Sequence, residues 1–178
     1  SFDLMIAFRL EPELDIFRSL SDFADAVSHA GEARYPIHLK LDTGMHRLGF
    51  MEDEIERLCA ELRTLPAVKV ASVFSHLNCA DMPEEDAYTR AQIARYDRMS
   101  AAVAASLPYG VIRHTANSAA IERFPEAQFD MCRLGLGLYG FGWEHNAGLR
   151  PVATLKTRIE QIKNLAAGAA VGYGRAGK

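Results

Sequence analysis

Polar side chains that could bind an anion or exchange protons recur directly after short apolar segments of this sequence. Taken singly, each has a structural explanation, such as a lysine stem beside apolar neighbours or a hydrogen-bonded histidine. Four successive apolar segments ending in this way are harder to attribute to packing. Glycines allow a backbone to approach a ligand, and the start of a helix suits an anion, so the pattern predicts a phosphorylated ligand. The polar residues concerned are Lys40, Arg47, His76, Asn117, Ser118 and Arg133, and Gly135 follows the last of them.

One tyrosine stands apart from the others. Tyr173 lies between Gly172 and Gly174, which leave its ring unshielded by neighbouring side chains. Its local context fits a turn residue and a functional group equally well. We interpret three other tyrosines as packing residues, namely Tyr88, Tyr96 and Tyr139.

Alternating hydrophobic patterns indicate the elements that must position these side chains. Helical spacing, with apolar residues three and four apart, alternates with short apolar runs typical of buried strands. The predicted strands are residues 4–8, 37–41, 68–74, 111–114 and 129–133. The predicted helices are residues 14–27, 55–65, 84–107 and 117–123.

This order of elements indicates an α/β fold with a parallel sheet. Strand–helix units of roughly 30 residues are the size of βαβ crossovers. Units that follow one another around a closed sheet predict a partial (β/α)8 TIM-type barrel, with functional groups at the carboxyl ends of its strands. A doubly wound sheet is the rival architecture, but no GxGxxG follows any predicted strand.

The pattern changes near residue 150 and predicts a second domain. Apolar Leu155 and Ile159 alternate with charged neighbours at a period of two, as in a half-exposed antiparallel strand. We therefore expect a partial barrel over residues 1–142, a linker over 142–150, and the beginning of a β-rich C-terminal domain over 151–178.

Composition narrows the class of protein. The chain has 178 residues, a formal net charge of −3, 49% hydrophobic and 24% charged residues, which indicates a folded globular chain. It has no apolar run near 18 residues and no secretory leader pattern. Three scattered cysteines without a CxxC suit a reducing compartment. We expect a cytoplasmic protein with no metal site, no nucleic-acid partner and no membrane span.

Five motifs, taken in order, resemble those of one enzyme family. His46 departs from that family's pattern, since many members have glycine there, while Arg47 is retained. The motifs are His38–Phe50, Ser75–Leu77 with Ala80–Asp81, His114–Ala120, Asp130–Gly140 and Val171–Gly174. They resemble the motifs of alanine racemases, and the likeness covers nearly the whole chain from Ile37 onward.

The resemblance implies an activity, a cofactor and an assembly. Members of this family are cytoplasmic isomerases that use pyridoxal 5'-phosphate to interconvert L-alanine and D-alanine, in D-alanine biosynthesis for peptidoglycan precursors. Their (β/α)8 barrel precedes a mostly β domain, and they work as head-to-tail homodimers. The implied small-molecule partner is thus an amino acid.

The resemblance also implies a role for each matching residue. Lys40 matches a lysine that is often carbamylated and then helps to hold Arg47, which contacts the substrate carboxylate and the phenolic oxygen of the cofactor. His76 and Arg133 match a relay from the catalytic tyrosine to the pyridine ring, and Tyr173 matches that tyrosine, which exchanges the proton on the L-alanine face. The phosphate-binding segments contain Asn117, Ser118, Gly135 and Leu136.

One expected feature of the family has no counterpart in this sequence. The lysine that attaches the cofactor precedes an Ala-x-Ala-Tyr-Gly-like run, and none of the lysines here has that context. They are Lys40, Lys69, Lys156, Lys163 and Lys178. We therefore expect an internal fragment of a longer racemase, inactive alone. Two alternatives remain open: a racemase of another amino acid such as serine, and a non-catalytic barrel fragment with a structural or partner-binding role.

Overall fold

Helices and parallel strands alternate along the first two thirds of the chain. The computed structural model describes residues 1–143 and 148–173. Its elements are α1 (Phe2–Ala7), β1 (Glu13–Leu14), α2 (Phe17–His29), β2 (Tyr35–Lys40), α3 (Ile55–Leu62), β3 (Val68–Phe74), α4 (Asp86–Ala105), β4 (Ile112–His114) and α5 (Ser118–Arg123). Short 3-10 turns occur at Glu52–Glu54, Pro83–Glu85, Pro125–Ala127 and Leu136–Tyr139.

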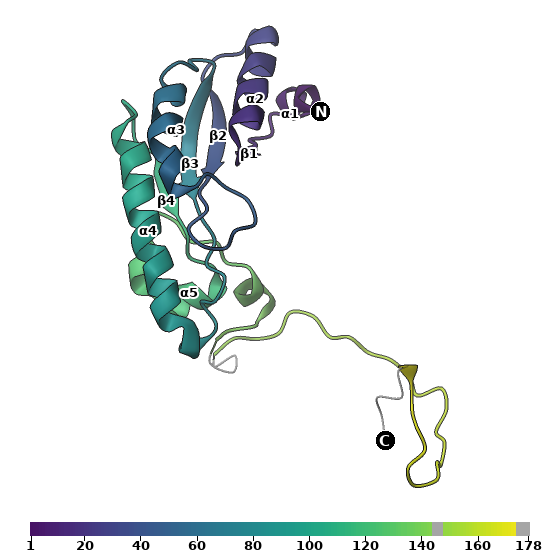
Figure 1. Ribbon diagram of the computed structural model, residues 1–178. Coiled ribbons are helices and arrows are strands. Elements are labelled where there is room, and N and C mark those ends of the chain that lie inside the picture. Colours follow the sequence, from purple (N-terminus) through teal and green to yellow (C-terminus); the bar gives the residue numbers. More distant parts are fainter. Residues whose placement is uncertain (144–147, 174–178) are drawn as a thin grey trace.

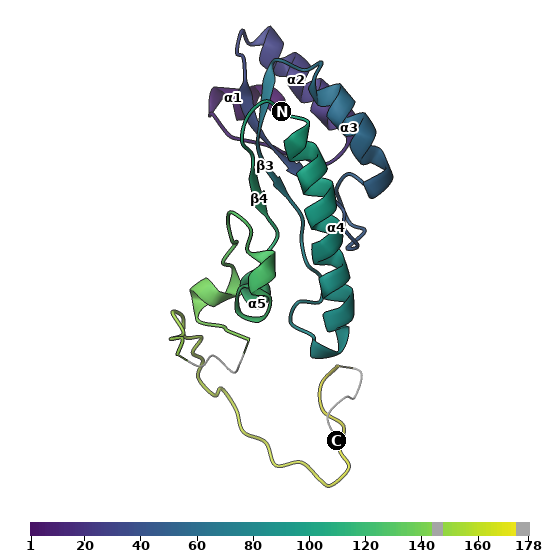
Figure 2. The ribbon, with the colours of Figure 1, turned by 90° about the vertical axis from the view of Figure 1, so that its left-hand side faces the viewer.

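The four strands form one sheet in the order β1-β2-β3-β4, and every pairing is parallel. Neighbours in sequence are therefore neighbours in the sheet, as in a barrel and unlike the crossed order of a doubly wound sheet. The expected α/β architecture with sequential parallel strands is confirmed. Figure 1 shows the strands beside the helices, and Figure 2 shows α4 running along β3 and β4.

One face of the sheet packs against the helices. Ile37, Leu39, Val70 and Val73 are buried and belong to a single apolar cluster with residues of the covering helices. The covering helices contribute apolar residues that recur three and four positions apart, and this spacing forms one apolar stripe on each helix. The helix residues of this cluster are Leu20, Phe23, Ala24, Val27, Ile55, Leu58, Cys59, Leu62, Tyr96, Met99 and Val103.

A β-bulge changes which side chains of β3 face away from the helices. Ile37 pairs with Val70, but the next residue, His38, pairs with Ser72, so Ala71 is the extra residue. A bulge of this kind re-aims the side chains that follow it. We call the face opposite the helices the inner face; its residues include His38, Lys40, Ser72, Phe74 and His114.

The predicted first strand is wrong. Residues 4–8 lie within and just after helix α1, and the first strand is Glu13–Leu14 instead. Phe2, Met5 and Ile6 are spaced as on one face of a helix, and they pack against the main core. A short apolar run does not by itself distinguish a helix from a strand, and here the helical face decides.

The predicted strand over residues 129–133 is also wrong. Phe129 has φ of 46°, a left-handed conformation that ends any extended run. The segment is held instead by single backbone bonds, from Asp130 to Arg113 at 3.0 Å and from Arg133 to Ala116 at 2.9 Å. These bonds lay it along β4 and beyond its end.

The C-terminal segment lacks the expected antiparallel strand. Residues 151–173 contain a single β-bridge residue, Val171, and no strand. They lead away from the sheet and helices (Figure 1). Residues 144–147 of the expected linker and 174–178 of the expected domain lie outside the described residues, and the division into two domains stays a prediction.

Candidate active site

A cavity of about 500 Å³ lies beyond the carboxyl ends of β3 and β4, where a barrel places its functional groups. Its size is within the range of small-molecule sites. Its lining comes from three segments that follow β2, β3 and β4 and from the segment before Leu136. The lining residues are Met45, His76, Leu77, Asn78, Asp81, Asn117, Ser118, Ala119, Arg133, Leu134, Gly135 and Leu136.

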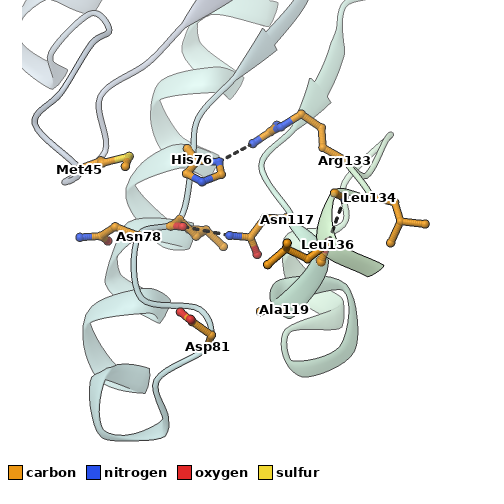
Figure 3. A pocket seen from close by; sticks show the side chains of 12 residues that line it. Met45, His76, Asn78, Asp81, Asn117, Ala119, Arg133, Leu134 and Leu136 are labelled. Carbon is orange, nitrogen blue, oxygen red and sulfur yellow. Dashed lines mark hydrogen bonds between the residues drawn. The ribbon is translucent and has the colours of Figure 1, made fainter. Parts of the chain in front are cut away.

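Arg133 is the most heavily hydrogen-bonded side chain of this cavity. Its guanidinium donates to His114 Nδ1 at 2.7 Å and to the carbonyl oxygen of Ser75 at 2.6 Å. It also donates to His76 Nδ1 at 3.3 Å, and Figure 3 shows these two side chains pointing toward each other. The guanidinium carbon lies 5.3 Å from the centroid of the Phe74 ring. These contacts fix both the position and the plane of the cation.

The surroundings keep both histidines neutral. Burial lowers the pKa of His76, and the cations of Arg133, Arg47 and Lys40 lower it further. Burial also lowers the pKa of His114 to about 4, with added repulsion from Arg133. Burial lowers the pKa of Arg133 as well. Since an arginine starts from a pKa above 12, its guanidinium remains the charged group of the three at neutral pH.

Ser118 forms a small cradle with two glycines. Its Oγ accepts hydrogen bonds from the backbone N–H of Gly135 at 2.9 Å and of Gly137 at 3.2 Å. With both acceptor positions used, its own hydroxyl proton is left to donate toward a ligand. Asn117 caps α5 by accepting from Ala120 N at 3.0 Å, and its amide donates to Leu77 O at 3.1 Å (Figure 3).

Lys40 and Arg47 flank the site on its β2 side. The ammonium of the nearly buried Lys40 pairs with Glu13 at 2.8 Å and lies 5.5 Å from the Phe74 ring centroid. Arg47 is exposed in the loop that follows β2. Both cations lower the pKa of His76. Carbamylation of Lys40 stays a prediction.

Helix α4 holds the loop that carries Arg47, and sequence reasoning missed this role. Arg95 donates to Thr43 O at 2.9 Å, and Tyr88 donates through its hydroxyl to Gly44 O at 2.6 Å. A Cβ at Gly44 would lie 2.7 Å from that hydroxyl, so the close approach requires glycine. The interpretation of Tyr88 as a packing residue omits this contact, because helical spacing carries no signal for it.

Tyr173 is not brought to this cavity by its own chain. Its side chain is fully exposed, at 104% of the reference value, and lies in the segment that leads away from the body. Asn117, Ser118, Gly135 and Leu136, by contrast, line the cavity together, as do His76 and Arg133.

The donor set fits an anionic, aromatic cofactor such as pyridoxal phosphate. The free hydroxyl proton of Ser118 suits a phosphate. The guanidinium of Arg133 is a fixed group that could donate to an acceptor atom of an aromatic ring. Leu134 and Leu136 add apolar surface. Asp81 is the only carboxylate of the described lining. Within residues 1–143 and 148–173, no cluster of three potential metal ligands occurs, and no helix is long and apolar enough to cross a membrane.

Sequential parallel strands with a donor-rich cavity at their carboxyl ends define the class: a (β/α) barrel domain with a ligand site in the usual place. Residues 1–142 match the model of the alanine racemase N-terminal domain, and the chain belongs to this family.

Similar proteins support this membership. An alanine racemase of Symbiobacterium thermophilum is 43% identical over 142 residues, which are 78% of this chain and 37% of that protein. One of Syntrophobacter fumaroxidans is 39% identical over 165 residues, 90% of this chain and 42% of that protein. The crystal structure of alanine racemase from D-cycloserine-producing Streptomyces lavendulae matches 98% of this chain and 48% of its own, with a TM-score of 0.84 and 30% identity. The chain therefore spans less than half of the relatives it matches.

Proposed function

We propose that this chain forms the phosphate- and ring-binding part of a pyridoxal-phosphate-dependent alanine racemase, which interconverts L-alanine and D-alanine for peptidoglycan precursors. The observation that carries the proposal is the environment of Arg133. Its half-buried guanidinium lines the cavity and, among the described residues, forms no ion pair with a carboxylate. Because Nη1 and Nη2 already donate within the chain, a ligand acceptor would meet the positive charge of this guanidinium and its Nε–H.

Bound pyridoxal phosphate supplies an electron-withdrawing ring that acidifies the Cα proton of an amino acid. Arg133 has donors only, so it would donate to the pyridine nitrogen and leave that nitrogen without a proton of its own. This arrangement weakens the electron sink and favours proton exchange over side reactions such as transamination. Ser118, Asn117, Gly135 and Leu136 would hold the phosphate.

His76 couples this cation to the proton-transfer group. Because its Nδ1 accepts from Arg133, its Nε2 carries the proton and remains a donor. A tyrosine of ordinary pKa about 10 is a poor base unless its phenolate is stabilised, and a donor backed by a cation provides that. We assign this role to Tyr173, which would enter the site of a second copy in a cytoplasmic homodimer.

The substrate carboxylate requires a separate cation. Arg47 lies in the loop fixed by Tyr88 and Arg95, and its exposed guanidinium suits bidentate binding of a carboxylate. Lys40, when carbamylated, would help to orient it. The alternative substrate, serine, has the same carboxylate, so these residues support both.

A chimeric enzyme tests the activity of these residues. This chain's residues 1–142 would replace the matching segment of the Symbiobacterium relative, and D-alanine and D-serine formation would be measured with pyridoxal phosphate present. We expect alanine to be racemised faster than serine, and Arg133→Lys to lower kcat by about tenfold or more, through lost charge-assisted hydrogen bonds. A folded, cofactor-loaded chimera that racemises neither amino acid would contradict the proposal.

One observation favours a non-catalytic role for the chain by itself: no lysine is among the described residues that line the cavity. We therefore expect the isolated chain to bind pyridoxal phosphate without forming D-alanine from L-alanine. Borohydride reduction followed by mass spectrometry should find no pyridoxyl group on Lys40. A covalent adduct there, together with turnover, would show that this chain is catalytically complete.

A further inference from the structure

A line of hydrogen bonds crosses the inner face of the sheet from Arg133 to the segment before β1. Arg133 Nη1 lies 2.7 Å from His114 Nδ1, and His114 Nε2 lies 3.0 Å from Ser72 Oγ. Ser72 Oγ lies 2.6 Å from His38 Nδ1, and His38 Nε2 lies 2.9 Å from Glu11 Oε2. The line thus passes through β4, β3 and β2 in turn.

When His38 is neutral, the chemistry of the end groups fixes the direction of every bond in this line. Arg133 can only donate, so His114 Nδ1 accepts and His114 Nε2 carries the proton, which it donates to Ser72. The Ser72 hydroxyl then donates to His38 Nδ1. That leaves the proton of His38 on Nε2, which donates to the carboxylate of Glu11. Every donor points from the cation toward the anion, and hydrogen bonds aligned in this way polarise and strengthen one another.

The bulge in β3 makes this line possible. With regular pairing after Ile37 and Val70, Ala71 would lie opposite His38, and alternation along the strand would turn Ser72 toward the helices. The bulge instead places Ser72 opposite His38 and within reach of His114. Ser72 and His114 are 2% and 5% exposed, so water competes little for their hydrogen bonds.

We propose that Ser72, His38 and Glu11 are positioning residues that act on Arg133 through His114. Ser72 accepts from Nε2 of His114 and so holds the orientation of the imidazole, whose Nδ1 then holds the guanidinium at the cavity. The consequence for the cofactor rests on the proposed function, whereas the direction of the relay does not.

Nitrogen NMR reads the direction of the relay. In the ¹⁵N-labelled protein at pH 7.5, two-bond ¹H–¹⁵N spectra distinguish the tautomers of each imidazole, and His38→Gln and His114→Gln assign the signals. We expect both rings to be neutral and protonated on Nε2. A proton on Nδ1 of His114, or on both nitrogens of His38, would overturn the relay.

Serine variants then test whether the relay positions Arg133. Ser72→Ala should remove the acceptor of the His114 Nε2 proton and so speed the exchange of that proton with water, while Ser72→Thr restores the hydroxyl and the slower exchange. The matched control is Ser100→Ala, since buried Ser100 likewise accepts from a side chain of β4, Arg113 Nε at 2.9 Å, but on the helix side of the sheet. Thermal melts verify that each variant folds.

Binding of pyridoxal phosphate separates this inference from the proposed function. We expect Ser72→Ala to raise the Kd about 2- to 10-fold, the effect of one hydrogen bond, with Ser72→Thr and Ser100→Ala near the wild type. An unchanged Kd in Ser72→Ala would overturn the positioning role. Expected tautomers in a wild-type protein that does not bind pyridoxal phosphate would count against the proposed function and leave the direction of the relay intact.

Discussion

On one face of the sheet, the side chains of Leu39 and Val73 pack among the apolar side chains of the helices; on the other, the side chains of His38 and Ser72 from the same strands form directional hydrogen bonds. The first kind of contact is non-directional and its strength follows the apolar area removed from water. The second depends on single donors and acceptors. The comparison teaches that one strand can supply stability with half of its residues and position charge with the other half.

Truncating a residue on the helix side should have the largest effect on stability. Leu39→Ala removes a fully buried side chain and should lower the free energy of unfolding by about 2–5 kcal/mol. Ser72→Ala, on the inner face, should cost no more than about 1–3 kcal/mol, through partners left unsatisfied. Urea unfolding of both variants measures the difference. If Ser72→Ala lowered the free energy of unfolding as much as Leu39→Ala does, the inner face would contribute to stability as strongly as the helix side.

Lowering the pH should reduce the free energy of unfolding, because His114 on the inner face is buried in its neutral form. The pKa of His114 falls from 6.5 in the unfolded chain to about 4 in the folded one, so the unfolded state binds more protons between these values. Stability should therefore decline as pH falls from about 6.5 to 4, by about 2–4 kcal/mol in all. Denaturant midpoints across this range measure it.

The His114→Gln variant is the control for this pH effect. It should show a shallower decline over the same range, with the lowered pKa of His76 accounting for part of what remains. An identical decline in wild type and variant would remove His114 from the explanation.

The loop that carries Arg47 should respond to a smaller change on α4. Tyr88→Phe removes the hydroxyl that donates to Gly44 O and should reduce amide protection in the loop by about 2- to 10-fold. Hydrogen exchange measures it, and Tyr139→Phe, at an exposed tyrosine, is the control. Unchanged protection in Tyr88→Phe would mean that Arg95 alone fixes the loop.

The smallest effect should come from His46, in the loop that carries Arg47. Its φ of 53° is left-handed, which favours glycine, but its ring pairs with Asp42 at 3.3 Å. We expect His46→Gly to change the free energy of unfolding by less than about 1 kcal/mol, toward greater stability. Thermal unfolding measures it, and a loss larger than this would mean that the pair with Asp42 dominates.

Hydrophobic spacing predicted the helix side of the sheet well. The strand at Val68–Phe74 has the bounds expected from its apolar run, and α3 and α4 begin within two residues of expectation. Such elements bury a regular apolar stripe, which the sequence states directly. The apolar run at residues 4–8 predicts a strand, but it belongs largely to helix α1, because a short apolar run fits either element.

The inner face was only partly predictable. Residues at strand ends, such as His76 and Asn117, follow from the rule that barrels place functional groups there. The orientation of Ser72 does not follow from this rule, because it depends on a bulge at Ala71 that the local sequence pattern does not predict. The contact between His76 and Arg133 joins segments 57 residues apart, and only the fold brings them together.

The most direct test of the account is whether the cavity recognises a phosphate on an aromatic ring. Titration calorimetry would compare pyridoxal phosphate with pyridoxal on the wild type, on Ser118→Ala and on the control Ser100→Ala. We expect pyridoxal phosphate to bind the wild type about tenfold or more tightly than pyridoxal, with the preference reduced in Ser118→Ala and kept in Ser100→Ala. Equal affinity for the two ligands, or a preference that Ser118→Ala leaves unchanged, would contradict the site described for this chain.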